Sequence, residues 1–161
     1  MRMAGFVLRG ALGIVAFWLV VMAALYWAMD RWQQPRQARV TAQGALELPR
    51  QTDGHFRVAG TVNGEPVLFV VDTGASIVSV SEALARRAGL RGGESASFHT
   101  ANGVRSGRIV RADSVVLSGG PRVDNLRVRL GLQVGDESQG LLGENFLQHF
   151  HMEIDGDRML L

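Results

Sequence analysis

The hydrophobic pattern begins with an uninterrupted apolar segment at residues 10–29, which contains no charged side chain. A helix rises 1.5 Å per residue, so about twenty residues span roughly 30 Å, the thickness of a bilayer's hydrocarbon core. Tyr26, Trp27 and Trp32 cluster at one end, as aromatic side chains do at a membrane interface. The pattern predicts a transmembrane helix over residues 10–29 that anchors the chain in a lipid bilayer, preceded by a tail at residues 1–9.

Two alternatives for this segment are a buried core helix and a cleaved signal peptide. A core helix is rarely apolar on every side. A signal peptide has a shorter apolar region and small residues before its cleavage site, and no such site follows Ala24. We therefore expect an uncleaved anchor. Its orientation does not follow from charge, because arginines lie close to both ends of the span.

The pattern changes after the apolar segment. Residues 30–51 are rich in Gln, Arg and Ala, include Pro35 and Pro49, and show no strong period, so we expect a linker. The remaining residues, 52–161, are about 110 in number and can bury a modest core. They form the predicted folded domain.

Short apolar runs and turn signals alternate through residues 52–161, which indicates a mainly β, closed or sandwich-like domain. The strands are expected at residues 55–62, 66–71, 95–101, 104–112, 115–117, 123–130, 152–154 and 158–161. Tight turns are expected at Asn63-Gly64, Asn102-Gly103 and Asp155-Gly156. One or two short helices complete the domain, at residues 81–88, where Ser81 is the expected N-cap and Gly89 the stop, and at residues 144–150.

Composition excludes several kinds of chemistry. The chain has no Cys, which rules out disulfides, thiol nucleophiles and Cys-based metal sites. Its net charge of +2 comes from the arginines of the first fifty residues, and the rest is mildly acidic, so no nucleic-acid partner is expected. His149 and His151 have no further ligands near them in sequence, so we expect neither a metal nor a cofactor.

One segment combines a buried strand with a carboxylate. The apolar run at residues 66–71 is followed by Asp72, Thr73, Gly74, Ala75 and Ser76. Glycine at position 74 lets the backbone pass close to the carboxylate, and Thr73 offers a hydroxyl for a bond between loops. Asp-Thr-Gly alone is a weak signal, because a strand that ends in an Asx-type turn carries the same residues.

Together with two later segments, this stretch resembles the retropepsin-like aspartic proteases, and more specifically the bacterial members with a single membrane span. That family has an apolar-apolar-glycine element near its C-terminus, here Leu141, Leu142 and Gly143, which supports the catalytic loop and precedes a short helix. A flap hairpin lies between the two elements. Its tip would be formed by Thr100, Ala101, Asn102, Gly103 and Val104. The resemblance covers residues 52–161.

The resemblance implies an endopeptidase with Asp72 as its catalytic residue. Two carboxyls sharing one proton are needed for the reaction, and the chain has one Asp-Thr-Gly, so the second Asp72 would come from a homodimer partner. The substrate would be a protein or peptide. The single-span members also imply a bacterial inner-membrane protein with a periplasmic domain. The alternative is a non-catalytic dimeric binding module, which self-cleavage between Pro35 and Pro49, lost in Asp72→Ala, would exclude.

The sequence departs from the family's retroviral members in two places. Ser76 and Glu144 stand where those members often carry an Asp and an Arg that form an ion pair, so we expect another contact, such as a Ser76 hydroxyl bond, in its place. The helix at residues 81–88 is an insertion, and substrate pockets are not carried over. The apolar end, residues 159–161, should pair in a sheet, either in the dimer seam or in the chain's own hairpin.

Overall fold

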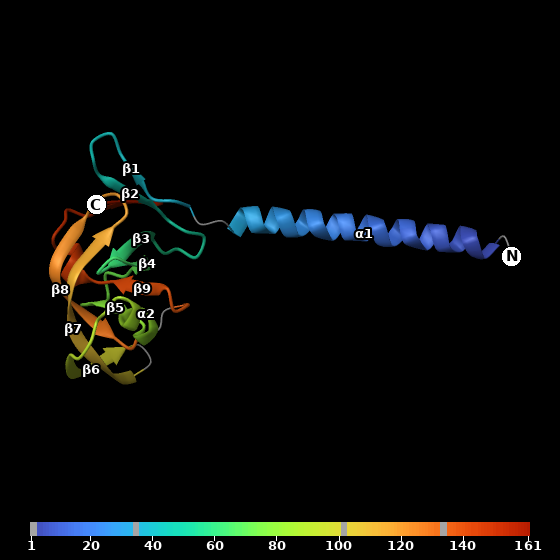
Figure 1. The fold of residues 1–161 in the computed structure, drawn as a ribbon. Coiled ribbons are helices and arrows are strands. Elements are labelled where there is room, and N and C mark those ends of the chain that lie inside the picture. Colours follow the sequence, from blue (N-terminus) through green and yellow to red (C-terminus); the bar gives the residue numbers. More distant parts are fainter. Residues whose placement is uncertain (1–2, 34–35, 101–102, 133–134) are drawn as a thin grey trace. The chain divides into compact units, whose positions relative to one another are not determined.

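The computed structural model describes residues 3–33, 36–100, 103–132 and 135–161. The chain divides into two units, Met1–Pro35 and Arg36–Leu161 (Figure 1). The second unit is mainly β, as predicted.

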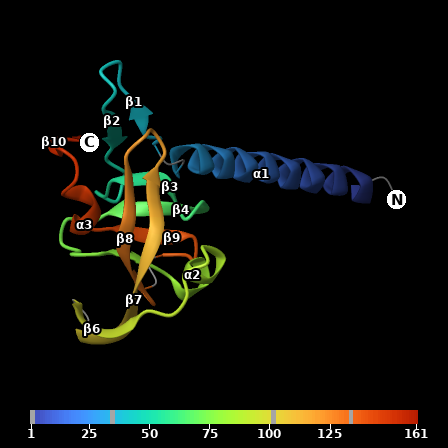
Figure 2. The ribbon, with the colours of Figure 1, turned by 60° about the vertical axis from the view of Figure 1, so that its left-hand side comes forward.

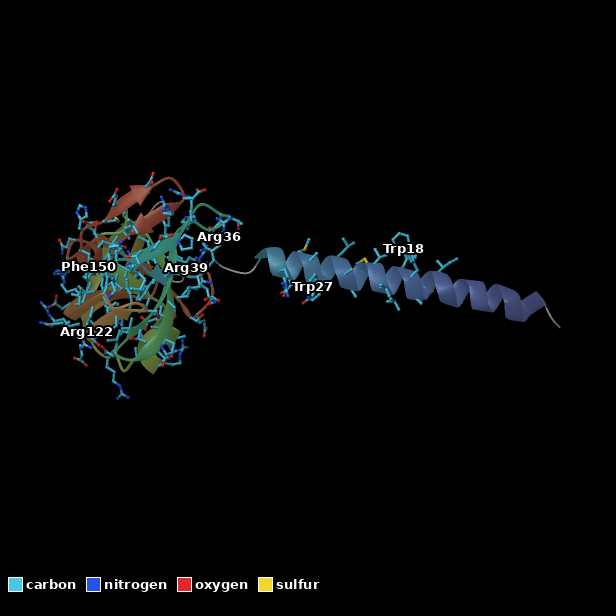
Figure 3. The ribbon with its side chains drawn as sticks, turned by 90° about the horizontal axis from the view of Figure 1, so that it is seen from above. Trp18, Trp27, Arg36, Arg39, Arg122 and Phe150 are labelled. Atoms are coloured by element: carbon cyan, nitrogen blue, oxygen red, sulfur yellow. The ribbon has the colours of Figure 1, made fainter. Side chains whose placement is uncertain are left out.

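The first unit contains one helix, α1 (Met3–Gln33), of 31 residues. It extends beyond the predicted span at both ends, and Gly13–Arg31 within it is long and apolar enough to cross a membrane or to serve as a signal sequence. None of its described side chains is buried. Figure 3 shows Trp18 and Trp27 directed away from the helix axis, and the Arg31 guanidinium lies 4.6 Å from the Trp27 ring centroid.

The linker predicted for residues 30–51 is wrong over most of its length. Helix α1 continues to Gln33, and the folded unit already begins at Arg36 rather than near Thr52. The backbone N–H of Arg36 donates to Gln51 Oε1 at 3.0 Å, while Gln51 Nε2 donates to the Arg36 carbonyl at 3.0 Å. This reciprocal pair fixes the start of the segment on the domain. The segment belongs to the folded domain because it contains a short strand, residues 46–49, that pairs with the C-terminal strand.

A four-stranded antiparallel sheet joins this segment to the C-terminus. Its strands, in spatial order, are β1 (Arg39–Val40), β2 (Leu46–Pro49), β11 (Arg158–Leu160) and β10 (Glu153–Asp155). Leu46 and Leu48 alternate with polar Glu47 and lie in the core. Because β11 is paired on both edges within its own chain, the apolar end of the chain pairs in its own hairpin and with β2. Figure 1 shows the C-terminus beside β1 and β2.

The larger sheet has seven strands. They are, in spatial order, β3 (Arg57–Val62), β4 (Glu65–Val71), β9 (Gln139–Leu142), β5 (Val78–Val80), β8 (Arg122–Leu130), β7 (Gly103–Leu117) and β6 (Glu94–Thr100). Figure 2 shows β7 and β8 as long neighbouring strands. The C-terminal end of β7 also pairs with β3, which closes the sheet from β3 to β7 and leaves β6 outside the closed part.

Several predicted elements differ in extent. Residues 104–112 and 115–117 belong to the single strand β7, because its register with β8 continues from Ala112↔Leu126 to Ser114↔Asp124. The turn at Asn63-Gly64 is present, with φ of 50° and 85°. Strands β5 and β9 have no counterpart among the predicted strands.

The two short helices lie where they were predicted. Helix α2 (Glu82–Arg87) starts after Ser81, whose hydroxyl accepts a bond from the Leu84 N–H at 3.1 Å. Helix α3 (Glu144–Leu147) is three residues shorter than predicted, and Phe146 and Leu147 bury its inner face. One core unites strands of both sheets with both helices; its largest fully buried side chains include Phe69, Phe146, Leu46, Leu48, Leu84, Leu142 and Met159.

Candidate active site

The predicted catalytic loop lies where three strands meet. Strand β9 runs between β4 and β5, parallel to β4, with Val71 opposite Leu142, and antiparallel to β5, with Ser79 opposite Leu141. The chain therefore leaves β4, crosses the end of β9 as the loop of residues 72–77, and returns as β5 on the other side. The strands at its two ends, β4 and β5, both pair with β9, and this pairing fixes the ends of the loop.

Gly143 allows the loop to cross this closely. A Cβ atom at this position would lie 2.6 Å from the Ile77 carbonyl carbon and 2.7 Å from the Ala75 carbonyl oxygen. Both atoms are backbone and cannot rotate away, so a side chain at position 143 would displace the loop. Leu142, just before it, is fully buried. The structure thus brings Leu141, Leu142 and Gly143 directly under the predicted catalytic loop.

Asp72 is held by its backbone and by the loop that follows. Its N–H donates to the Leu142 carbonyl at 3.1 Å, and its carbonyl accepts from the Ala75 N–H at 3.1 Å. Its carboxylate oxygen Oδ1 accepts from the Gly74 N–H at 2.9 Å. The side chain is half-buried, whereas Thr73, Gly74 and Ser76 are exposed. The carboxylate is therefore oriented by a main-chain bond and remains accessible.

The start of α3 fastens the other end of the loop. Glu144 N–H donates to the Ala75 carbonyl at 2.7 Å, and Asn145 N–H donates to the Ser76 carbonyl at 3.2 Å. The Asn145 side chain accepts from the Val78 N–H and donates to the Arg127 carbonyl, each at 2.8 Å. One amide thus joins α3, β5 and β8 beside the loop.

The sequence predicted that a bond of the Ser76 hydroxyl replaces the ion pair of the retroviral proteases. Other groups make the described contacts between the loop and α3. The described bond of Ser76 to α3 uses its carbonyl, and the connecting side chain belongs to Asn145. Sequence reasoning missed Asn145, although it lies in the first turn of the predicted helix, next to Glu144. An amide there can satisfy a backbone donor and a backbone acceptor at once.

The predicted flap is a hairpin of β6 and β7, in which His99 is opposite Val104 and Thr100 is opposite Gly103. Gly103 has φ of 100°, a left-handed conformation suited to glycine. The Val104 side chain is 62% exposed. The remaining predicted tip residues, Ala101 and Asn102, lie outside the described residues.

Three other aspartates of the domain are Asp113, Asp124 and Asp136. Asp124 accepts a bond from Arg122 Nε at 2.8 Å. Asp136 accepts bonds from the hydroxyl and N–H of Ser138, and these bonds hold the pKa of its carboxyl below the usual range. Asp113 is exposed on β7. Among the residues described, none of these carboxylates bonds to the Asp72 loop, and no cluster of three or more potential metal ligands is found.

This arrangement of strands, loop and hairpin matches known proteases. The fold is similar to the crystal structure of a retropepsin-like aspartic protease from Rickettsia conorii, with a TM-score of 0.62 and 30% identity, covering 73% of this chain and 89% of that chain. The family model described as "gag-polyprotein putative aspartyl protease" matches residues 58–149. The chain belongs to the retropepsin-like aspartic proteases. The family resemblance predicted from the sequence is thereby confirmed.

A curated relative is similar over a comparable part of the chain. It is uncharacterized protein RP867 from Rickettsia prowazekii (strain Madrid E), 31% identical over 125 residues, which are 75% of this chain and 52% of the relative. The chain thus spans about half the length of this relative. The retropepsin family match begins in β3 and ends after α3, so it contains the Asp72 loop, β9 and the flap strands, while the four-stranded sheet lies outside it.

Proposed function

We propose that this retropepsin-like protein is a membrane-anchored aspartic endopeptidase whose catalytic pair consists of Asp72 from two copies of the chain. The carboxylate geometry carries the proposal. Asp72 is accessible and is oriented by the Gly74 N–H at 2.9 Å. Its loop packs closely against Gly143, and the Asn145 side chain accepts a bond from Val78 at the loop's end. A rigid loop with an accessible carboxylate suits catalysis better than a purely structural turn.

Peptide hydrolysis needs a base and an acid, and a pair of Asp72 carboxyls would supply both. In aspartic protease pairs, two carboxyls about 3 Å apart share one proton, because both cannot be ionised. The ionised carboxylate takes a proton from water as the water oxygen attacks the peptide carbonyl carbon. The protonated carboxyl donates its proton to the carbonyl oxygen. When the C–N bond breaks, one carboxyl protonates the leaving nitrogen and the other carboxylate takes a proton from a hydroxyl of the tetrahedral intermediate, which yields the acid and restores the shared proton.

The second carboxyl is assigned to a partner because the chain has one Asp-Thr-Gly, at residues 72–74, and two of its other aspartates are engaged elsewhere. Asp124 pairs with Arg122, and Asp136 is held by Ser138. A two-fold axis through the site would place identical loops face to face. Helix α1, acting as an anchor, would confine both copies to one surface and raise their effective concentration.

Mixing two forms of the chain tests the shared site. We expect equal amounts of wild type and Asp72→Asn, after subunit exchange, to give about one quarter of the activity of wild type at the same total concentration, because random pairing leaves one quarter of dimers intact. Asp113→Asn, which alters an exposed carboxylate on β7, is the matched control and should leave activity unchanged. One half of the activity would mean that each chain works alone and would refute the shared pair.

The proposal includes a bacterial inner-membrane location with the protease domain in the periplasm. A C-terminal alkaline phosphatase fusion should then be enzymatically active, because this enzyme matures only outside the cytoplasm. An inactive phosphatase fusion, together with a fluorescent C-terminal green-protein fusion, would place the domain in the cytoplasm.

A further inference from the structure

The arginines of the folded unit fall into two groups. Six of them have a carboxylate partner within 4.0 Å; these are Arg50, Arg57, Arg87, Arg108, Arg122 and Arg158. Among the residues that the structure describes, seven arginines of this unit have none; these are Arg36, Arg39, Arg86, Arg91, Arg111, Arg127 and Arg129. Three of these seven, Arg91, Arg111 and Arg127, come from separate stretches of sequence and line one cavity, and Arg129 lies two residues from Arg127 on β8.

Strand register explains how they meet. Arg111 is directly opposite Arg127, and Ile109 is opposite Arg129, so these four side chains share one face of the β7–β8 pair. Val110 and Val128 point to the other face and are buried in the core. Like charges placed directly opposite on a sheet are destabilising. Binding of a negatively charged group would relieve the repulsion between the exposed guanidinium groups of Arg111 and Arg127, so this face favours an anionic ligand.

A cavity of about 650 Å³ lies over this face. Its lining includes Arg91, Gly93, Glu94, Ile109, Arg111 and Arg127. Arg111 donates to the Asn125 carbonyl at 3.1 Å, which holds its guanidinium in place while leaving other N–H groups available. Three arginines and one glutamate give the groove a net positive charge. We call it the arginine groove.

Arg129 is paired in register with Ile109, which lines the arginine groove, and is partly desolvated. Its guanidinium lies 4.6 Å from the Phe98 ring centroid, and its Nε atom is buried without a hydrogen-bond partner in the described structure. Burial lowers its pKa. A cation with incomplete hydration interacts more strongly with an approaching anion than one in open water.

The groove lies next to a free sheet edge. Strand β6 is the last strand in the order and, within the described ranges of the chain, pairs only with β7. Its outer backbone groups are available to an extended chain, as in peptide recognition by strand addition. Residues Gly93 and Glu94, at the start of β6, line the arginine groove.

We propose that the arginine groove and the adjoining edge of β6 bind an extended acidic peptide segment, which serves as a docking sequence of the substrate. The part about substrate rests on the proposed protease function. An acidic peptide fits because it carries both carboxylates for the guanidinium groups and backbone groups for the open edge. Glu94 within the groove disfavours a uniformly charged polyanion such as nucleic acid. Strand β6 is seven residues long, or roughly 20 Å, so the docking sequence would lie several residues away from the bond cleaved under the flap.

Binding is measured on the full chain carrying Asp72→Asn, in detergent, so that catalysis plays no part. The probes are fluorescein-labelled twelve-residue peptides containing four Glu or, as a neutral match, four Gln. Anisotropy should show tighter binding of the Glu peptide, and Arg111→Gln or Arg127→Gln should weaken it about threefold to tenfold. Arg122→Gln is the control, because it removes the same charge from exposed β8 surface outside the groove (Figure 3).

Three results would overturn the proposal. These are equal binding of the two peptides, an equal loss in the Arg122→Gln control, and tighter groove-dependent binding of single-stranded DNA than of the Glu peptide. With the active chain, Arg111→Gln should raise KM only for substrates that carry an acidic extension and leave kcat unchanged. An inactive chain that still binds the Glu peptide through Arg111 would contradict the protease function and leave the groove assignment intact.

Discussion

Removing residues 36–51 should destabilise the folded domain severely, although these residues resemble a linker in sequence. Leu46 and Leu48 of β2 are 1% and 0% exposed, respectively. Burial of a Leu side chain contributes about 1.5–3 kcal/mol, so losing both costs about 3–6 kcal/mol. Strand β2 also bonds β11 and its flanks, where Leu46 and Leu161 exchange N–H···O bonds of 2.8 and 3.0 Å. A domain of this size has about 5–15 kcal/mol of stability in total.

The test compares two fragments in urea, one of residues 36–161 and one of residues 52–161, both carrying Asp72→Asn to prevent proteolysis. Far-UV circular dichroism is the suitable signal, because all three Trp residues and the single Tyr lie in α1 and are absent from both fragments. With a urea m-value of about 1.5 kcal/mol/M, the shorter fragment should unfold about 2–4 M earlier or be unfolded without urea.

Point variants separate packing from chain length. Leu48→Ala in the longer fragment should cost about 2–5 kcal/mol. Val40→Ala, on a side chain that is 54% exposed, should change stability by less than about 0.5 kcal/mol. Equal urea midpoints for the two fragments would refute the reasoning and would mean that β2 packs without contributing to stability.

Two further predictions concern the loop that carries Asp72. Gly143→Ala should lose most peptidase activity and about 1–3 kcal/mol of stability, because its Cβ would lie 2.6–2.8 Å from backbone atoms of Ala75 and Ile77. The measurements are peptide cleavage and urea unfolding, and Ser76→Ala, which removes an exposed hydroxyl, is the control. Asn145→Ala should cost about 1–3 kcal/mol by leaving the Val78 N–H and the Arg127 carbonyl unpaired, whereas Gln148→Ala, which loses one 3.4 Å bond, should be nearly neutral. Unchanged stability in either loop variant would contradict the assigned contacts.

Features that depend on neighbouring residues could be predicted from the sequence. Asn63-Gly64 predicted a tight turn, where the structure has positive φ, and Ser81 predicted the start of α2; both are confirmed. The apolar strand before Asp72 was predicted almost at its bounds, since strand β4 covers Glu65–Val71. In each case neighbouring residues alone determine the preferred backbone.

Features that depend on distant pairing were missed. Strands β5 and β9 have three and four residues, too few for a period-two pattern to stand out, and they form because each completes the other's pairing. Strand β2 looked like linker because only Leu46 and Leu48 alternate and a proline follows. The arginine groove was missed for a similar reason. In sequence, Arg127 and Arg129 alternate with apolar residues, which is typical of the solvent-exposed face of a strand, and only the register with β7 brings Arg111 beside them.

The pairing of residues 36–51 with the C-terminal strand has a consequence for how long the protein stays attached to its helix. A protease cleaves extended, accessible backbone, and here the segment after the helix is tied down by β2 and by the reciprocal bonds between Arg36 and Gln51. Cutting it would first require local unfolding of the four-stranded sheet. Self-release between Pro35 and Pro49 is therefore disfavoured, and the intact chain should persist where a protease on a long flexible tether would shed its domain.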